Sequence, residues 1–350
     1  MIYYICHRKY AYTLAVFFYY FRNDLAGRLR FLSYDAFFQM NEIHTGVFIF
    51  TDFDRLDSDQ MERAKKHAIL LERADSSNVI LNHPDRFLGR FDLLQTLHAR
   101  DPKAPATCRL IDWKQVRDFP VFIRGERDHL AALSGLIDTA TALETTAKRL
   151  LSEHRNIDDV MVIQFQNQLN EEGFYEKYGA FRVGDTIYGQ HLFQHQSWWV
   201  KENAADWNDQ QRACNFDYID ENPHVDMLMP IFEAAGIEYG RIDYCLMDGR
   251  VVVFEINTNP VVNARPPSRG LGYDAQKYAD MHNAAMLALP QVAPKLITLD
   301  DAKSASNVGM TVQEAHRKAL ARVRWRIFRR RCASFAKTVT KAIKRQRNIG

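Results

Sequence analysis

Cysteine is scarce in this chain, and so are glycine and proline. The five cysteines are scattered and never spaced as Cys-x-x-Cys, which argues against a disulfide framework and against a zinc site. We therefore expect a reducing compartment and a cytoplasmic protein. With 16 glycines and 11 prolines in 350 residues, the sequence is neither collagen-like nor of low complexity.

Long apolar runs and familiar catalytic motifs are also missing. The apolar run over residues 11–21 lacks a small-residue cleavage site and falls short of the ~20 residues that span a bilayer, so we interpret it as a buried element. The sequence has no GxSxG, P-loop or GxGxxG motif, which disfavours serine nucleophiles and Rossmann-type dinucleotide binding. His191 and His195 would share a helix face, but a zinc site would need a third ligand.

Charge is nearly balanced over the chain but is unevenly distributed. Residues 311–350 hold thirteen Lys and Arg against one acid, Glu314, which is a local charge of +12. Because the whole chain carries +3, the first 310 residues carry −9. The pattern predicts a mildly acidic body and a strongly basic tail.

The first hundred residues alternate between β-rich runs and segments with apolar residues at helical spacing. Strands are predicted at 2–6, 29–32, 47–50 and 78–81, and helices at 10–22, 58–74 and 86–99. Strands that alternate with helices typically form a parallel sheet with helical crossovers. We therefore predict a small α/β domain over residues 1–100.

A hinge at residues 101–105 precedes a different pattern. The order is a strand at 119–123, a helix at 130–152, a strand at 160–165, a hairpin at 180–188, part of a helix at 230–235 and a second hairpin at 241–256. We predict a second folded region over residues 101–295, followed by a linker and a helical tail over residues 296–350.

The hairpin at 241–260 holds the sharpest chemical signal. Folding it about Asp248-Gly249 places Asp243 and Glu255 approximately opposite each other, where Cβ atoms lie ~4.5–5.5 Å apart. Asn257, two residues beyond Glu255, points to the same face. Three oxygen-bearing side chains therefore converge on one patch of a sheet.

Two carboxylates that close repel each other unless something neutralises them. A shared proton would do so, and so would a divalent cation, for which all-oxygen ligands suit Mg²⁺. A solvated hairpin edge is the alternative interpretation. The run over residues 251–256 is apolar on both faces, which predicts a buried strand, and a buried acid needs a partner.

Asp243 together with the run Phe254-Glu-Ile-Asn-Thr-Asn-Pro260 resembles the C-terminal metal-binding signature of the ATP-grasp superfamily, which includes D-alanine–D-alanine ligase and glutathione synthetase. The resemblance extends loosely over about residues 75–290. It implies an ATP-grasp fold, in which a small α/β domain precedes two α+β lobes that clamp ATP. It also implies a ligase that uses ATP and Mg²⁺ to join a carboxylate to an amine through an acyl phosphate.

The resemblance implies roles for particular residues. Asp243, Glu255 and Asn257 match the magnesium ligands that bridge the ATP phosphates. The strand ending in Arg124 matches the family's phosphate-binding strand, and Arg90 falls where an earlier lysine reaches phosphate.

Other matches concern the base and the substrate. The strand over residues 162–166 resembles the one that holds adenine, which singles out Gln164, Phe165 and Gln166. Lys177 precedes a strand on which the family carries charged residues facing the nucleotide. Arg265 sits where family members hold an acyl phosphate or a substrate carboxylate.

Two departures from the family pattern favour an alternative, a nucleotide-binding scaffold without turnover. Arginine replaces lysine at both phosphate positions, although arginine also binds phosphate. The loop over residues 125–135 is poor in glycine, whereas a phosphate loop needs glycines for close backbone approach. If the enzyme is active, we expect small-molecule or peptide carboxylates and amines as substrates.

Apolar residues recur among the basic residues of the tail, which predicts a rough amphipathic helix. Such a helix could lie on an anionic membrane, making the protein peripheral to it. It could equally fold back on the acidic body. A nucleic-acid partner is a third interpretation that we do not favour.

Overall fold

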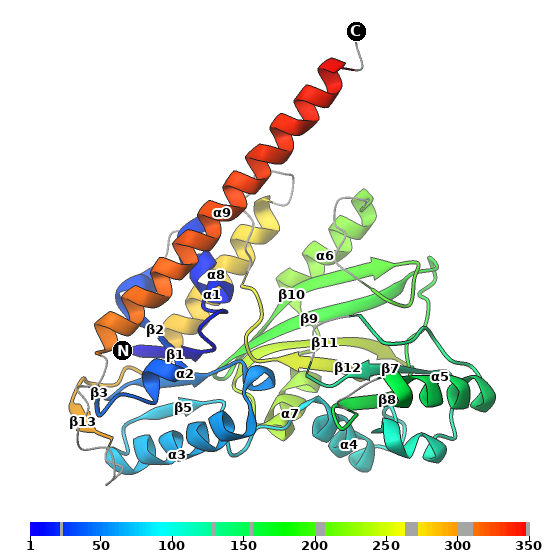
Figure 1. Ribbon diagram of the computed structural model, residues 1–350, viewed down its shortest axis with the longest axis horizontal. Helices are drawn as coiled ribbons and strands as arrows, with labels where there is room; N and C mark the ends of the chain where they lie inside the picture. The colour runs from blue at the N-terminus through cyan, green and yellow to red at the C-terminus, as the bar shows by residue number, and fades with distance from the viewer. Residues whose placement is uncertain are drawn as a thin grey trace.

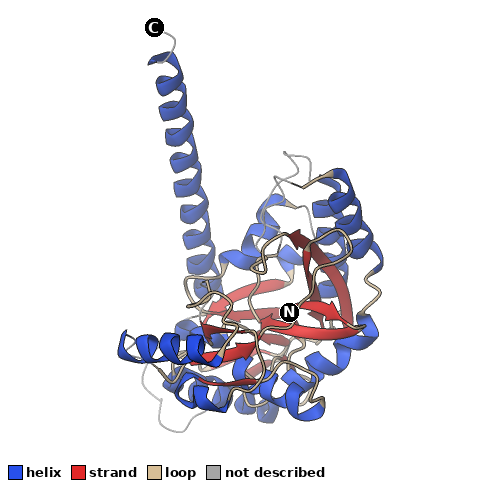
Figure 2. Cartoon of the chain, turned by 90° about the vertical axis from the view of Figure 1, so that its right-hand side faces the viewer, coloured by secondary structure: helices blue, strands red, loops and turns tan. Residues whose placement is uncertain are grey.

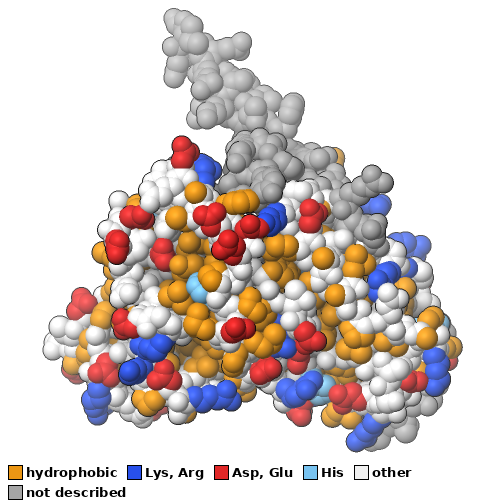
Figure 3. Space-filling view, turned by 180° about the vertical axis from the view of Figure 1, so that it is seen from behind, with side chains coloured by type: hydrophobic (Ala, Val, Ile, Leu, Met, Phe, Trp, Pro, Cys, Tyr) orange, Lys and Arg blue, Asp and Glu red, His pale blue; other side chains and the backbone are white. Residues whose placement is uncertain are grey.

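The structure is a computed structural model. It describes residues 1–21, 24–127, 131–153, 157–200, 207–262, 272–299 and 311–347. Strands occupy the interior and helices cover them, while the last helix projects away from the rest of the chain (Figures 1 and 2). Acidic and basic side chains are interspersed with hydrophobic ones over the face seen from behind (Figure 3).

The N-terminal part is an α/β unit built on a parallel sheet. Its strands lie in the order β2-β1-β4-β5. Their bounds are Ile2–Cys6 (β1), Leu29–Ser33 (β2), Val47–Phe50 (β4) and Val79–Leu81 (β5). The connections include α1 (Tyr12–Tyr20), η1 (Asp24–Gly27), α2 (Tyr34–Phe37), η2 (Phe53–Arg55) and α3 (Ser58–Ala74). The predicted α/β pattern of this region is confirmed.

Local chemistry explains why α3 begins and lies where it does. The Asp57 side chain accepts from the Gln60 backbone N–H, and the Gln60 side-chain oxygen accepts from the Asp57 backbone N–H. These two bonds form a capping box. Ala64, Ala68 and Leu71 follow at helical spacing and are buried against the sheet. Because both faces of the sheet are covered, β1 and β4 are buried along their whole length.

Two antiparallel sheets follow. The smaller has the order β6-β8-β7, with bounds Thr107–Arg109 (β6), Val121–Gly125 (β7) and Val160–Gln164 (β8). The larger has the order β10-β9-β11-β12, with bounds Tyr175–Val183 (β9), Thr186–His195 (β10), Tyr239–Met247 (β11) and Arg250–Asn257 (β12). The described chain is thus of mixed α/β class, with parallel and antiparallel sheets.

Helices flank these sheets. They are α4 (Arg90–Arg100), η3 (Leu110–Gln115), α5 (Ala140–Glu153), α6 (Asp209–Glu221), α7 (Val225–Ala235) and α8 (Gly272–Ala288). A hydrophobic cluster joins α4 and α7 to the larger sheet, and another joins α5 to the smaller one. Together they hold β7, β8 and β12 close to one another (Figure 1).

The predicted helix at 130–152 is wrong in its first half. The helix begins only at Ala140, and the residues before it lie along β7. There Ile137 forms a bridge with Val121, and the Leu133 N–H donates to the Ile123 carbonyl. Backbone N–H and C=O groups that would bond within a helix therefore form hydrogen bonds with the free edge of β7 instead.

The basic tail forms the long helix α9 (Val312–Arg347), which follows a short pairing of β13 (Leu296–Thr298) with β3 (Glu42–His44). The first half of α9 packs on the N-terminal sheet, where Ala319 and Val323 join its hydrophobic cluster. Its second half extends beyond the body (Figures 1 and 2). Among the described helices, none combines the length and apolarity needed to cross a bilayer.

Candidate active site

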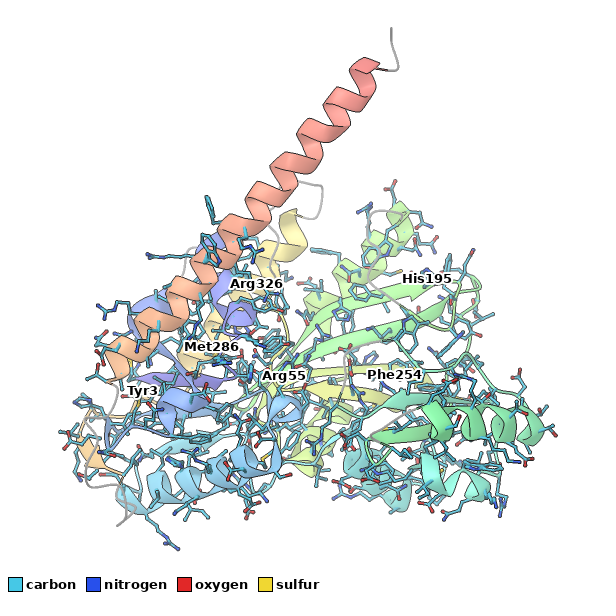
Figure 4. All side chains as sticks on the ribbon, in the orientation of Figure 1. Tyr3, Arg55, His195, Phe254, Met286 and Arg326 are labelled. Atoms are coloured by element: carbon cyan, nitrogen blue, oxygen red, sulfur yellow. The ribbon has the colours of Figure 1, made fainter. Side chains whose placement is uncertain are left out.

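The β11–β12 hairpin follows the register of its turn from Met247–Arg250 as far as Tyr244–Val253. Asp248 and Gly249 both have positive φ, 51° and 72°, and the strands pair outward from them. Asp243 pairs directly with Glu255, as predicted. A β-bulge beside this pair leaves Phe254 as the extra residue on β12, marked in Figure 4.

Asp243 lies at the centre of the sheet with its side chain 3% exposed. Arg241, on the same face of β11, donates from Nε to Oδ1 at 2.6 Å and from a terminal nitrogen to Oδ2 at 3.2 Å. Lys177 Nζ on β9 lies 3.1 Å from Oδ2. Burial alone would raise the pKa of Asp243, but Arg241 and Lys177 outweigh it and hold the pKa well below its usual range.

Glu255 is neutralised by cations from the neighbouring elements. Arg90, the first residue of α4, donates to its Oε2, and an Arg124 terminal nitrogen on β7 lies 3.8 Å from the same oxygen. Arg90 also donates to the Gly125 carbonyl at 3.2 Å. Burial opposes ionisation, yet Arg90 and Arg124 together lower the pKa of Glu255.

Both carboxylates are therefore ionised at neutral pH, without a shared proton. Four cations surround two carboxylates, namely Arg90, Arg124, Lys177 and Arg241. This cluster has an excess of positive charge in a largely desolvated place where two sheets meet. Such a place suits an anion rich in oxygen, because desolvation strengthens each interaction with it.

His191 completes a row across the larger sheet. It pairs with Gly179, which in turn pairs with Asp243. A Cβ on Gly179 would lie 2.3 Å from His191 Cε1, so glycine is required for the imidazole to lie over β9. Burial, reinforced by Arg241, lowers the pKa of His191 well below its usual value. The expected helix face for His191 and His195 is wrong, since both lie on β10.

Asn257 and Asn259 connect the hairpin to the N-terminal unit. The Asn257 Oδ1 accepts from the Asn259 N–H at 2.8 Å. The Asn259 side chain donates to Asp52 Oδ2 at 2.6 Å and accepts from the Tyr4 hydroxyl at 2.6 Å and from the Thr13 hydroxyl. This network ends between the carboxyl ends of β1 and β4, where the strand order reverses.

The predicted adenine strand is in contact with aromatic side chains. The Gln164 N–H donates to the Ala106 carbonyl and the Phe165 N–H to the Pro120 carbonyl, both at 2.8 Å. The Phe165 ring lies 5.7 Å from the Trp198 ring, which also packs on Phe122 at 5.5 Å.

Gln166 lies at the end of the same segment. Its side-chain nitrogen donates to Gln164 Oε1 at 3.1 Å, and its backbone carbonyl accepts from Cys245. Its own side-chain oxygen is buried without a hydrogen-bond partner. An orphaned buried acceptor of this kind marks a place where a donor from a ligand would be favourable.

A metal ion is compatible with the hairpin in donor chemistry. Asp243, Glu255 and Asn257 offer oxygen only, and both carboxylates are ionised, as Mg²⁺ requires. In the described structure their charge is offset by protein cations, and no group of three or more His, Cys, Asp or Glu is gathered to hold a metal there. Arg265 lies outside the described residues.

The structure brings Arg90, Arg124 and Lys177 together around Asp243 and Glu255, whereas the Asn257 side chain bonds to the Asn259 N–H. Sequence reasoning missed Arg241 and Asn259. Arg241 could have been found, because it is two residues from Asp243 and so shares its face. The bond from Asn259 to Asp52 spans 207 positions and has no local signal.

Comparisons of the sequence with protein-family models and with curated proteins find no match. Comparison with solved structures finds D-alanine–D-alanine ligase from Bacillus anthracis, 12% identical, over 82% of this chain and 97% of that one, with a TM-score of 0.44. A RimK domain ATP-grasp protein from Sphaerobacter thermophilus is 12% identical over 80% and 99%, with a TM-score of 0.42. The ATP-grasp ligase PsnB is 13% identical over 81% and 96%, with a TM-score of 0.48. The second and third of these structures are described as ATP-grasp proteins.

Proposed function

We propose that this protein is an ATP-grasp ligase that uses ATP and Mg²⁺ to join a carboxylate to an amine. The observation that carries the proposal is the cationic cluster around the ionised Asp243–Glu255 pair, placed where β7, α4 and the larger sheet meet. The positive charge of the cluster and its burial away from water suit a polyphosphate. The two carboxylates suit the Mg²⁺ ion that accompanies ATP.

The chain's own residues would do most of the work by positioning charge. Arg90, Arg124 and Lys177 would turn from the carboxylates towards phosphate oxygens and neutralise charge that develops on them. Asp243, Glu255 and Asn257 would hold Mg²⁺, which when bound screens the phosphates from one another. Asn259 would keep the Asn257 side chain oriented through its N–H.

The reaction has two steps, and neither step needs a nucleophile from the protein. A substrate carboxylate oxygen attacks the γ-phosphorus and ADP leaves, which forms an acyl phosphate. The amine nitrogen then attacks the acyl carbon, inorganic phosphate leaves, and the nitrogen loses a proton to form the amide. Arg265 would orient the acceptor carboxylate in this scheme. Small molecules and peptides are both candidate substrates.

Calorimetric titration with ATP, in the presence and absence of Mg²⁺, tests nucleotide binding. We expect Mg²⁺-dependent binding to the intact protein and at least a tenfold loss in Asp243→Asn/Glu255→Gln. Asp101→Asn is the matched control, because Asp101 pairs with Arg250 at 3.5 Å at the other end of the same hairpin. Absence of binding to the folded intact protein would refute the proposal. Amine-dependent ADP release over a panel of carboxylates then tests turnover.

A nucleotide-binding scaffold without turnover is the second candidate. Arginine at both predicted phosphate positions and the glycine-poor loop over residues 125–135 favour it. A base reaching the predicted adenine strand must stack on or displace Trp198, which contacts Phe165 and Phe122. Nucleotide binding that perturbs tryptophan fluorescence, and loses this signal in Trp198→Phe, would place the base there. Binding without ADP release on any carboxylate and amine pair would then support the scaffold.

A further inference from the structure

A cavity of about 220 Å³ lies between α9 and the N-terminal unit. Its walls come from the turn after β1, from α2 and from one face of α9. None of its lining residues belongs to the cationic cluster around Asp243 and Glu255. Its volume is smaller than the ~300–1,000 Å³ of pockets for drug-sized ligands, so any ligand would be small.

The floor of the cavity is apolar and exists because alanines occupy it. Ala11 and Ala36 line it from the N-terminal unit, and Ala315 and Ala319 line it from α9. All four are buried. Larger side chains at these positions would close the space, whereas alanine leaves room for a few carbon atoms.

The rim is positively charged. Arg8, Lys318 and Arg322 are in the lining, with Asp35 as its one carboxylate. Arg8 lies 4.0 Å from Asp35, and both side chains are about half exposed. Lys318 and Arg322 are four residues apart on one helix face, where like charges repel. Glu314, one turn earlier on α9, already interacts with Lys318, and an anion held between Lys318 and Arg322 would add a negative charge next to both cations.

The cavity has fixed walls because α9 is anchored on both sides of it. The Phe31 N–H donates to His316 Nδ1 at 3.0 Å, and the two rings stack. Further along, the Arg326 guanidinium lies 3.6 Å from the Tyr12 ring centre. Arg326 is labelled in Figure 4 where α9 passes the N-terminal unit.

We propose that this cavity binds a small anion with a carboxylate or phosphate head and a short apolar part. The head would lie between Lys318, Arg322 and Arg8, and the apolar part would lie on the alanine floor. Such a ligand touches both α9 and the N-terminal unit, so its binding favours the docked helix. The site does not depend on the ligase proposal.

Calorimetric titration of the full chain at constant ionic strength tests the site, with inorganic phosphate, acetate and butyrate as separate probes and chloride as the reference. We expect saturable binding of at least one probe and at least tenfold weaker binding in Arg322→Ala. Binding of butyrate above acetate would assign a carboxylate with an apolar part, and binding of phosphate alone would assign a phosphate head. Arg324→Ala is the matched control, because Arg324 is exposed on the same helix and outside the lining.

Ala319→Leu fills the floor and leaves every charge in place, so it should also remove binding while the protein stays folded by circular dichroism. Should this variant fail to fold, the comparison of probe binding to Arg322→Ala with probe binding to Arg324→Ala tests the site. Phosphate binding that survives Arg322→Ala but is lost in Arg90→Ala belongs to the cationic cluster and would overturn the proposal. Absence of saturable binding of all three probes would overturn it as well.

Discussion

The Arg241–Asp243 pair should contribute strongly to stability. Both side chains are largely buried, 18% and 3% exposed, and the guanidinium contacts both carboxylate oxygens. Removing one partner of such a pair leaves a buried charge uncompensated, which costs about 3–5 kcal/mol. We therefore expect Asp243→Asn to lower the free energy of unfolding by about that amount, and Arg241→Met to lower it by less, because Lys177 Nζ still lies 3.1 Å from Asp243 Oδ2.

A double-mutant cycle isolates the pair. In urea unfolding followed by circular dichroism, the double variant should lose about 2–3 kcal/mol less than the sum of the two single losses. Glu153→Gln is the control, since the Arg149–Glu153 pair lies at 2.7 Å but is about half exposed, and should change stability by less than about 1 kcal/mol. A coupling energy below about 0.5 kcal/mol would refute the reasoning.

Two further predictions concern pH, one concerns the link between the units and one concerns the tail. Because the pKa values of Asp243 and Glu255 are lowered in the folded state, their ionised carboxylates stabilise the fold above pH ~4. The free energy of unfolding should therefore fall as the pH drops below that value, and it should fall less steeply in Asp243→Asn. An equal slope in the variant would contradict this. Burial, partly offset by Arg55, raises the pKa of Asp52 to about 7, so native Asp52 keeps its proton where the unfolded chain loses it. Stability should then fall between pH ~4 and ~7 by at most about 4 kcal/mol, and Asp52→Asn should flatten that fall in urea titrations. Asn259→Ala should lower the free energy of unfolding by about 1–3 kcal/mol, because its buried hydrogen-bond partners lose their bonds, and it should weaken Mg²⁺-dependent ATP binding. If stability and ATP binding are both unchanged, the hydrogen bonds of Asn259 are dispensable. Deleting residues 311–350 should lower the Tm, because the buried Val323 side chain alone contributes about 2 kcal/mol of hydrophobic stabilisation. An unchanged Tm would mean that α9 docks weakly.

The tail also bears on the alternatives that its sequence left open. Its first half folds back on the N-terminal sheet through Ala319, Val323 and His316. Trp325 and Phe328 on α9 remain exposed, at 60% and 56%. Membrane contact through residues 311–350 stays a prediction, and sedimentation of the intact and truncated chains with anionic liposomes would measure it.

Local rules sufficed for several elements. The helix at 58–74 follows from its capping box and apolar spacing, and its observed bounds equal the predicted ones. The two-residue turn at Asp248-Gly249 fixes the pairing from Met247–Arg250 to Tyr244–Val253. The turn alone would place Asp243 opposite Phe254, and the β-bulge at Phe254 is what brings Glu255 opposite Asp243. The domain boundaries at residues 100 and 295 stay predictions.

The sequence by itself therefore determined the alternation of strands and helices, the hairpin that carries Asp243 and Glu255, and the basic character of the tail, since each depends on residues close together in the chain. Only the tertiary structure decided what neutralises the two carboxylates. Arg90, Arg124 and Lys177 reach them from three other elements, and Asn259 reaches Asp52 across 207 positions. Periodicity constrains a strand or a helix, but the partner of a buried charge is fixed by how whole elements pack.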